Sequence, residues 1–192
     1  MENCIVIRQA VVSDAPEIHA LLQKAFREYA DIIGVKEVEA LRESVSDIEY
    51  EITNNTVFAA MVDNKIIGTI RIEILDDEAY ISRFAVDSYF RNMGVGESLM
   101  NLADKFLMSK GIKKAFLYTA SHHMNLVRFY YARGFYIESV SHEKGYPRAK
   151  MVKNYPEANT ETADFVNIKQ TLSIANKVVP LKIKMFLRNR IK

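Results

Sequence analysis

The sequence contains no tryptophan, one cysteine and four prolines in 192 residues. The single cysteine, Cys4, excludes an intramolecular disulfide and is typical of a reducing compartment. This cysteine and the four scattered histidines lack the spacing of zinc ligands, so we expect no metal site. No run approaches the roughly 20 apolar residues of a membrane-spanning helix, and the first residues, with Glu2, do not resemble a secretory signal. We therefore expect a cytoplasmic protein.

The chain also lacks a large net charge, because its 26 basic residues are nearly balanced by 24 acidic ones. The two signs are distributed unevenly. Residues 155–192 hold seven Lys or Arg and three acids, whereas 19 basic and 21 acidic residues occupy residues 1–154. This contrast predicts a domain over 1–154 and a basic, apolar extension over 155–192.

The extension has several possible roles. Its apolar positions fit packing on the domain or on a second copy of the chain, as in a homodimer. Its basic charge also fits an anionic membrane surface, although a membrane is the weaker expectation. The segment PLKIKMFLRNRIK alternates like a strand at first and equally resembles a basic amphipathic helix. A nearly neutral chain without interleaved basic and aromatic residues argues against nucleic acid as the main ligand.

Apolar spacing and turn residues divide residues 1–154 into alternating elements. The expected order is β-α-α-β-β-β-α-β-α-β-β, with a three-strand meander before the central helix. A mixed sheet with helices on its faces follows, of the α/β (α+β) class. The expected strands and helices are 4–12, 13–30, 35–52, 56–62, 65–75, 79–86, 96–110, 114–120, 124–133, 135–143 and 148–155.

A glycine-containing turn, RNMGVG, joins the third meander strand to the central helix. The free amides at a helix N-terminus bind anions, and glycines let a phosphate approach the backbone closely. Arg91 adds a bidentate donor. The Walker pattern and the G-x-G-x-x-G pattern are both absent, because no Lys-Ser or Lys-Thr follows and Leu99 occupies the last glycine position. A phosphate-binding turn is favoured over glycines that merely allow the chain to bend.

The stretch FAVDSYFRNMGVGESLM resembles motif A of the GNAT family of acyl-CoA-dependent N-acetyltransferases, whose signature is [RQ]-x-x-G-x-[GA]. Arg91, Gly94 and Gly96 match that signature. The downstream LVRFYYARGF is similar to the family's second conserved segment. The resemblance covers residues 4–154 and implies a GNAT-like, mostly antiparallel central sheet flanked by helices.

The resemblance also implies acetyl-CoA as cosubstrate and assigns site residues. The backbone of Phe84 and Val86 would pair with the pantetheine arm, and the turn would hold the pyrophosphate. Tyr130 would protonate the departing thiolate. The implied coenzyme-binding residues are Phe84, Ala85, Val86, Arg91, Asn92, Met93, Gly94, Val95, Gly96, Glu97, His123, Asn125 and Tyr130.

Two positions depart from the family pattern. Where an asparagine often precedes the tyrosine by seven residues, this chain has His123, with Asn125 two places on. Where histone-acetylating relatives carry a glutamate base, this chain has Tyr80. His123 and its neighbour His122 are favoured as loop residues over metal ligands or catalysts.

The sequence does not decide which group acts as the general base. A DDE turn would place Leu75 opposite Ala79, Glu73 opposite Ile81 and Arg71 opposite Arg83. Glu73 would then act as a base beside an arginine pair, or it would belong to an ordinary solvated sheet face. Tyr80 and a water chain are the alternatives.

We therefore expect an N-acetyltransferase that moves an acetyl group from acetyl-CoA to a primary amine by direct attack in a ternary complex. The amine belongs to a small molecule or a protein, and the family pattern places its pocket along residues 29–41. The alternative is a GNAT-fold module that binds acyl-CoA as a sensor or scaffold and catalyses little.

Overall fold

The computed structural model describes residues 4–156 and 181–182, and it has the element order that the sequence predicts, with a short strand β8 added. The strands are β1 Cys4–Gln9, β2 Thr56–Val62, β3 Lys65–Leu75, β4 Glu78–Val86, β5 Lys114–Ala120, β6 Tyr136–Ser141, β7 Arg148–Asn154 and β8 Leu181–Lys182. The helices are α1 Ala15–Ile33, α2 Val45–Asn54, α3 Val95–Ser109 and α4 Met124–Tyr131. Short 3-10 turns are η1 Val12–Asp14, η2 Glu39–Leu41 and η3 Ser88–Phe90.

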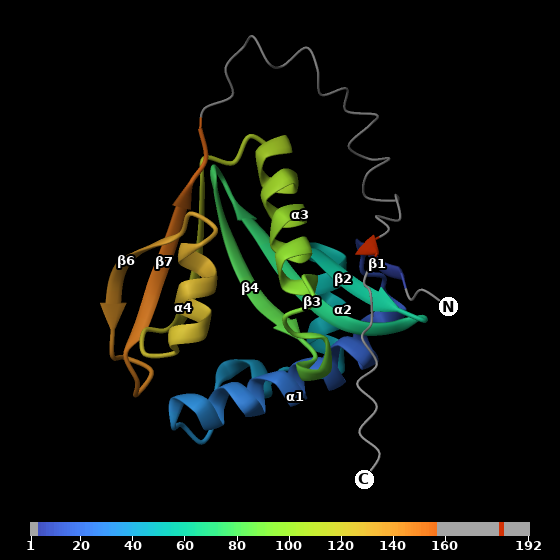
Figure 1. The fold of residues 1–192 in the computed structure, drawn as a ribbon, viewed down its shortest axis with the longest axis horizontal. Helices are drawn as coiled ribbons and strands as arrows, with labels where there is room; N and C mark the ends of the chain where they lie inside the picture. The colour runs from blue at the N-terminus through green and yellow to red at the C-terminus, as the bar shows by residue number, and fades with distance from the viewer. Residues whose placement is uncertain (1–3, 157–180, 183–192) are drawn as a thin grey trace.

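The strands form one mixed sheet in the order β6-β7-β5-β4-β3-β2-β1-β8. Every neighbouring pair is antiparallel except β4 and β5. These two strands pair in parallel only from Glu78 opposite Lys114 to Tyr80 opposite Phe116. Beyond that point they separate, and Figure 1 shows β4 and β7 close together at one end and far apart at the other. The separation splits the sheet along its middle.

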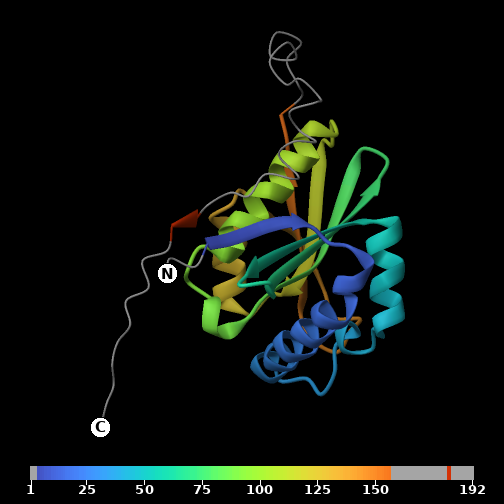
Figure 2. The same ribbon diagram turned by 90° about the vertical axis from the view of Figure 1, so that its right-hand side faces the viewer.

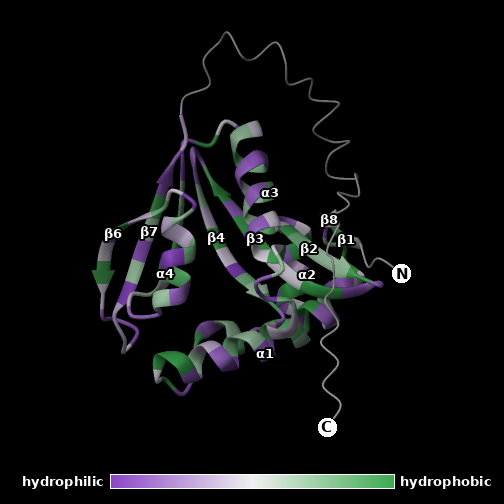
Figure 3. Cartoon of the chain, viewed as in Figure 1, coloured by the Kyte–Doolittle hydropathy of each residue, from purple (hydrophilic) through white to green (hydrophobic). Residues whose placement is uncertain are grey.

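Helices cover both faces of the sheet (Figure 2). The α1 and α2 side encloses a buried cluster that includes Ile18, Leu22 and Ile48. The α3 side encloses a larger cluster that includes Leu99, Leu107 and residues of β5, α4 and β7. Hydrophobic and hydrophilic residues alternate along α1 and α3 (Figure 3), as expected for helices with one buried face.

Helix ends follow local sequence signals. Helix α1 ends at Gly34, whose left-handed backbone (φ 75°) suits a glycine at a helix C-terminus. Helix α2 begins after Ser44, whose side chain accepts from the amide of Asp47 in a capping box. This cap explains one correction: the expected helix over 35–52 is wrong in its first part, where η2 and irregular chain precede a helix that starts at Val45.

The expected register between β3 and β4 is also wrong. Glu73 lies opposite Tyr80, not Ile81, and Arg71 lies opposite Ser82, not Arg83. The register then shifts at an irregularity where Arg83 has a left-handed backbone (φ 48°). Counting from the turn failed because a three-residue turn, Asp76 to Glu78, was expected, whereas the chain turns over Asp76 and Asp77 alone and pairs Leu75 with Glu78.

Of the predicted extension, residues 155–192, only Tyr155, Pro156 and the strand β8 lie within the described residues. Strand β8 pairs antiparallel with β1, Cys4 opposite Lys182. The expectations of a helix and of a dimer contact concern residues outside the described part. Among the described helices, none has the length and apolarity required to cross a bilayer.

Candidate active site

A cavity of about 850 Å³ opens where β4 and β5 separate. Its wall includes residues 80–86 of β4 and 117–119 of β5, together with parts of α1, η2, α3, α4 and the turn before β7. One edge of β4 is paired with β3, whereas β5 pairs with it no further than Tyr80 within the part of the chain described. The backbone groups of Phe84 to Val86 therefore face the cavity along a free strand edge.

The glycine turn forms one end of this cavity through Arg91, Asn92, Gly94 and Gly96. Gly94 is the N-cap of α3 in a left-handed conformation (φ 81°), and no side chain caps the helix. The first amides of α3 lack partners within the helix, so the positive end of the helix dipole points at the cavity. This arrangement is suited to an anion such as a phosphate.

Arg91 is held in place beside that helix end. Its Nε donates to the carbonyl of Val86 at 3.1 Å, and its Nη2 lies 2.6 Å from Glu28 of α1. Both side chains of the ion pair are partly exposed, so an incoming phosphate competes with Glu28 for the guanidinium.

Gly96 has a second role that the sequence did not reveal. A Cβ atom at this position would lie 3.1 Å from Cζ of Phe84 and 3.5 Å from Cζ of Phe129. The two rings stack with centroids 5.3 Å apart. The glycine therefore lets the first turn of α3 approach the aromatic floor of the cavity as well as an anion.

Tyr130 lies on that floor, near the end of α4. It is buried, and its ring contacts Phe84, Phe129 and Phe135. Burial raises the pKa of its phenol, with Tyr29 and Tyr80 adding to the shift and Arg133 opposing it. The hydroxyl therefore stays protonated at neutral pH and is available as a proton donor.

His123 begins α4 as its N-cap, accepting from the amide of Leu126 at 3.3 Å. Its ring stacks on Tyr29 with centroids 5.5 Å apart. Burial lowers its pKa, and the charges of His122 and Arg91 act in the same direction. A neutral imidazole that caps a helix is thus a structural feature of the cavity wall, next to Asn125.

The other end of the cavity is rich in tyrosine. Tyr80 stacks on Phe116 and meets Tyr118 edge to face, with centroids 5.2 and 5.9 Å apart. The hydroxyl of Tyr29 accepts from the amide of Ala120 at 2.7 Å, which ties α1 to the end of β5. Residues 37–40 lie in this wall, and they belong to the segment 29–41 along which the family pattern places the acceptor pocket.

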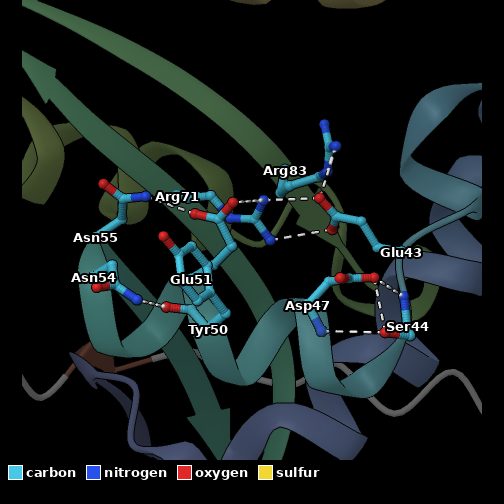
Figure 4. Close-up of polar contacts among 9 residues, drawn as sticks. All are labelled: Glu43, Ser44, Asp47, Tyr50, Glu51, Asn54, Asn55, Arg71 and Arg83. Carbon is cyan, nitrogen blue, oxygen red and sulfur yellow. Dashed lines mark hydrogen bonds and ion pairs between the residues drawn. The ribbon is translucent and has the colours of Figure 1, made fainter.

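Arg83 of this wall belongs to an ion-pair network with Glu43 and Arg71 (Figure 4). Glu43 accepts from both terminal nitrogens of Arg71 and lies 2.8 Å from Nη2 of Arg83. Burial alone would raise the pKa of Glu43, but the bonds from the two arginines outweigh it and the pKa is lowered. Glu43 is therefore an ionised structural group and a poor proton acceptor.

Twelve of the residues that the sequence singles out line this one cavity: Tyr80, Phe84, Ala85, Val86, Arg91, Asn92, Gly94, Gly96, Glu97, His123, Asn125 and Tyr130. The other three lie outside its wall. Glu73 is half-buried on β3 opposite Tyr80, Val95 belongs to the hydrophobic core, and Met93 is half-buried in the turn. Arg71 and Arg83 do come together, but on Glu43, and Glu73 makes no ion pair with either among the described residues.

Sequence reasoning did not identify several cavity residues, namely Glu28, Tyr118, Tyr146 and Arg148. They come from four separate elements or turns, and no short spacing connects them. Within the described ranges, no group of three or more His, Cys, Asp or Glu side chains is arranged to hold a metal ion.

The chain belongs to the acetyltransferase (GNAT) family, whose model matches residues 16–135. Among curated proteins it is similar to spermidine N(1)-acetyltransferase of Thermoplasma acidophilum, 26% identical over 148 residues, which cover 70% of this chain and 89% of that protein. This relationship identifies the class of protein as an acyl-CoA-dependent acetyltransferase.

Solved structures share the fold. One is the PaiA N-acetyltransferase of Thermoplasma acidophilum in complex with coenzyme A, with a TM-score of 0.70 and 22% identity over 79% of this chain and 99% of that one. Another is the ribosomal-protein-S18-alanine N-acetyltransferase of Escherichia coli, with a TM-score of 0.66 and 16% identity over 81% and 97% of the two chains. The mixed, mostly antiparallel GNAT-like architecture that the sequence predicts is confirmed.

Proposed function

We propose that this protein transfers an acetyl group from acetyl-CoA to a primary amine by direct attack within a ternary complex. The observation that carries the proposal is one continuous cavity that joins three features: an uncapped helix N-terminus beside Arg91, the free edge of β4, and Tyr130. A pyrophosphate, an amide-containing arm and a thioester require these three kinds of group in this order. The neighbour crystallised with coenzyme A supports the choice of cosubstrate.

The chemistry assigns one step to Tyr130. The neutral amine attacks the thioester carbonyl, the carbon–sulfur bond breaks, and the departing sulfur takes the phenolic proton. Because burial keeps the phenol protonated, it can serve as this acid, and solvent then restores its proton. The only cysteine of the chain, Cys4, lies on β1 outside the cavity wall, which favours direct transfer over an acyl-cysteine intermediate.

No single side chain is proposed as the base. The four acids in the wall are Glu28, Glu37, Glu39 and Glu97, and each already pairs with a basic side chain. Burial raises the pKa of Tyr80, which leaves it a phenol at neutral pH. Instead, the amine would lose its proton to water at the cavity mouth. This route leaves the ion pairs of the four acids intact and Tyr80 protonated.

The first experiment is calorimetric titration of coenzyme A and acetyl-CoA into three proteins: the unmodified chain, Arg91→Gln, and Arg27→Gln as a matched control. Arg27 is an exposed arginine of α1 outside the cavity wall. We expect micromolar binding that weakens about tenfold in Arg91→Gln through loss of a charge-assisted contact. Arg27→Gln should bind normally. Absence of binding to the unmodified chain would refute the proposal.

The second experiment separates an enzyme from a sensor. Tyr130→Phe should retain its affinity for acetyl-CoA and lose about 10²- to 10⁴-fold in turnover, the range typical of a general acid. Phe also preserves the packing of the ring against Phe84 and Phe135. Full binding with no turnover by the unmodified protein, across a broad panel of amines, would favour the sensor instead.

A further inference from the structure

The tyrosine-rich end of the cavity carries an imbalance of charge. Each acid in the wall is within 2.9 Å of a basic side chain: Glu28 with Arg91, Glu37 with Arg42, Glu39 with Lys144, and Glu97 with Arg133. The wall also contains Arg148 and the exposed Arg128, and neither has an acid at ion-pair distance among the residues described. At its tyrosine-rich end the cavity therefore offers in Arg148 a cation without a carboxylate partner, whereas the acids Glu37 and Glu39 are already paired.

Arg148 differs in this respect from its neighbours. The other basic side chains of β7 and of the turn before it each have a carboxylate partner. Lys144 lies 2.6 Å from Glu39, Lys150 lies 2.7 Å from Glu138, and Lys153 lies 2.7 Å from Asp104. The charge of Arg148 contributes to lowering the pKa of Glu39, whose main cause is the hydrogen bond from Lys144. That carboxylate is thus already engaged.

Packing holds the Arg148 guanidinium at the wall of the cavity. Its Cζ lies 4.3 Å from the ring centroid of Tyr118, an arrangement that fixes a guanidinium while leaving its edge donors available. Tyr118 in turn contacts Tyr80. Arg83 lines the same end, and its ion pair with Glu43 restrains it there.

This cluster lines the same cavity as the residue proposed as the acid. Arg148, Arg83, Tyr80 and Tyr130 all belong to its wall. An anion bound at Arg148 therefore lies in the same continuous space as the proposed acid.

We infer that the amine acceptor carries a carboxylate, and that Arg148, assisted by Arg83, binds this carboxylate. The inference rests on the proposed function and adds the substrate class. A guanidinium binds a carboxylate bidentately, which fixes both the position and the orientation of the acceptor. A polyamine has the opposite charge pattern, and would meet an unpaired cation where it needs a carboxylate. The carboxylate belongs either to a free amino acid or to an acidic residue near the N-terminus of a peptide.

The test compares acceptors in matched pairs. Free amino acids are measured against their α-carboxamides, dipeptides with Asp in second place against those with Asn, and spermidine is included. The readout is kcat and KM for release of the coenzyme A thiol. We expect the carboxylate member of a pair to have a KM lower by about tenfold or more, because a charge-assisted contact is lost in the amide. A difference between amino acids and their carboxamides indicates the carboxylate of a free amino acid. A difference between the Asp and Asn dipeptides indicates an acidic residue near the N-terminus of a peptide.

Variants then assign the effect to Arg148. Arg148→Gln should abolish the preference for the carboxylate member, Arg148→Lys should retain part of it, and Arg27→Gln should keep all of it. Unchanged affinity for acetyl-CoA in Arg148→Gln shows that the fold is intact. An effect confined to KM indicates acceptor binding and not chemistry.

Binding is measured separately from turnover, by calorimetric titration of the same pairs into the protein saturated with coenzyme A. Binding of the carboxylate member that is lost in Arg148→Gln supports the inference even if no acetyl group is transferred, in which case only the proposed function fails. Equal use or equal binding of acid and amide, or a preference for spermidine, overturns the inference while the acetyltransferase proposal stands.

Discussion

Arg71 and Glu43 form a forked ion pair, in which Nη1 and Nη2 of the arginine lie 2.8 and 3.1 Å from the two carboxylate oxygens. The pair joins the centre of β3 to the residue that precedes the N-cap of α2, and it is almost completely enclosed, with side-chain exposures of 7% and 14%. The same carboxylate restrains Arg83 at the irregularity of β4. One buried acid therefore fixes both the backbone fold of this region and an arginine of the cavity wall.

Replacement of Glu43 should destabilise the folded protein. We expect Glu43→Gln to lower the free energy of unfolding by about 3 kcal/mol, because Arg71 and Arg83 lose their shared counter-ion in a buried place. Denaturant unfolding measures the loss. Glu51→Gln is the matched control, since Glu51 is 3.4 Å from Arg71 and more exposed, and its effect should be clearly smaller. Equal effects of the two variants would contradict the central role of Glu43.

The same carboxylate predicts a dependence on pH. The pKa of Glu43 is lowered in the folded protein, so its contribution to stability is present above the ordinary value of 4.5 and is lost as the pH falls through the lower, folded value. The decline in stability on acidification should therefore be shallower in Glu43→Gln than in the unmodified chain. Unfolding measured at a series of acidic pH values tests this. Identical slopes would count against it.

His123 predicts a second effect in a different pH range. Because burial lowers its pKa in the folded state, the unfolded chain binds the proton first as the pH falls below 6.5. Stability should decline from pH 6.5 downward and be unaffected by this group at higher pH. His123→Asn, which keeps an N-cap side chain, should flatten that decline. His142→Asn, at an exposed turn before β7, is the control and should leave the slope unchanged.

Asp104 joins α3 to the end of β7. Its carboxylate accepts from the hydroxyl of Tyr155 at 2.6 Å and from Lys153 at 2.7 Å. We expect Asp104→Asn to lower the free energy of unfolding by about 1–3 kcal/mol, since a charged acceptor of two donors is lost in a partly buried place. Tyr155→Phe removes only one donor and should cost less. The reverse order in thermal or denaturant unfolding would contradict this account.

Gly68 of β3 lies where α3 packs tightly against the sheet. A Cβ atom there would lie 3.0 Å from Cδ1 of Leu99 and 3.2 Å from Cγ1 of Val95, both in the buried core. We expect Gly68→Ala to destabilise the protein by about 1–3 kcal/mol through overpacking. Ser139→Ala, at an exposed strand position of β6, is the control and should change little. An unchanged melting temperature in Gly68→Ala would show that the helix can shift at no cost.

Much of the fold could be predicted because it is encoded locally. The apolar stripe of α1 and its terminating Gly34 lie within one continuous stretch, and so do the strands of the meander. The start of α2 was missed although its signal was present, since Ser44 and Asp47 form a capping pattern three residues apart. The β3–β4 register was wrong because the turn takes two residues, Asp76 and Asp77, where three were expected. The later irregularity, where Arg83 adopts a positive φ, follows no sequence rule either.

The residues of the candidate site likewise divide into those that the sequence identifies and those that it does not. The turn from Arg91 to Gly96 and Tyr130 lie in short motifs, and the sequence placed them in one site. Arg148 and Glu43 could not be identified from short motifs, because the residues that contact them lie far away in the chain. Glu43 meets Arg71 across 28 residues, and Arg148 meets Tyr118 only through the pairing of β5 with β7.

The early separation of β4 from β5 has a consequence for the handling of the protein. A free strand edge is a template on which another chain can add a strand, and proteins usually protect such edges to avoid aggregation. Here the edge lies inside the molecule, along residues 81–86, and side chains of α1, α4 and the turn before β7 line the space in front of it. A ligand that fills this space completes the ladder of β4. Solubility and resistance to aggregation should therefore increase when the cavity is occupied, and purification in the presence of the cosubstrate should yield the better-behaved sample.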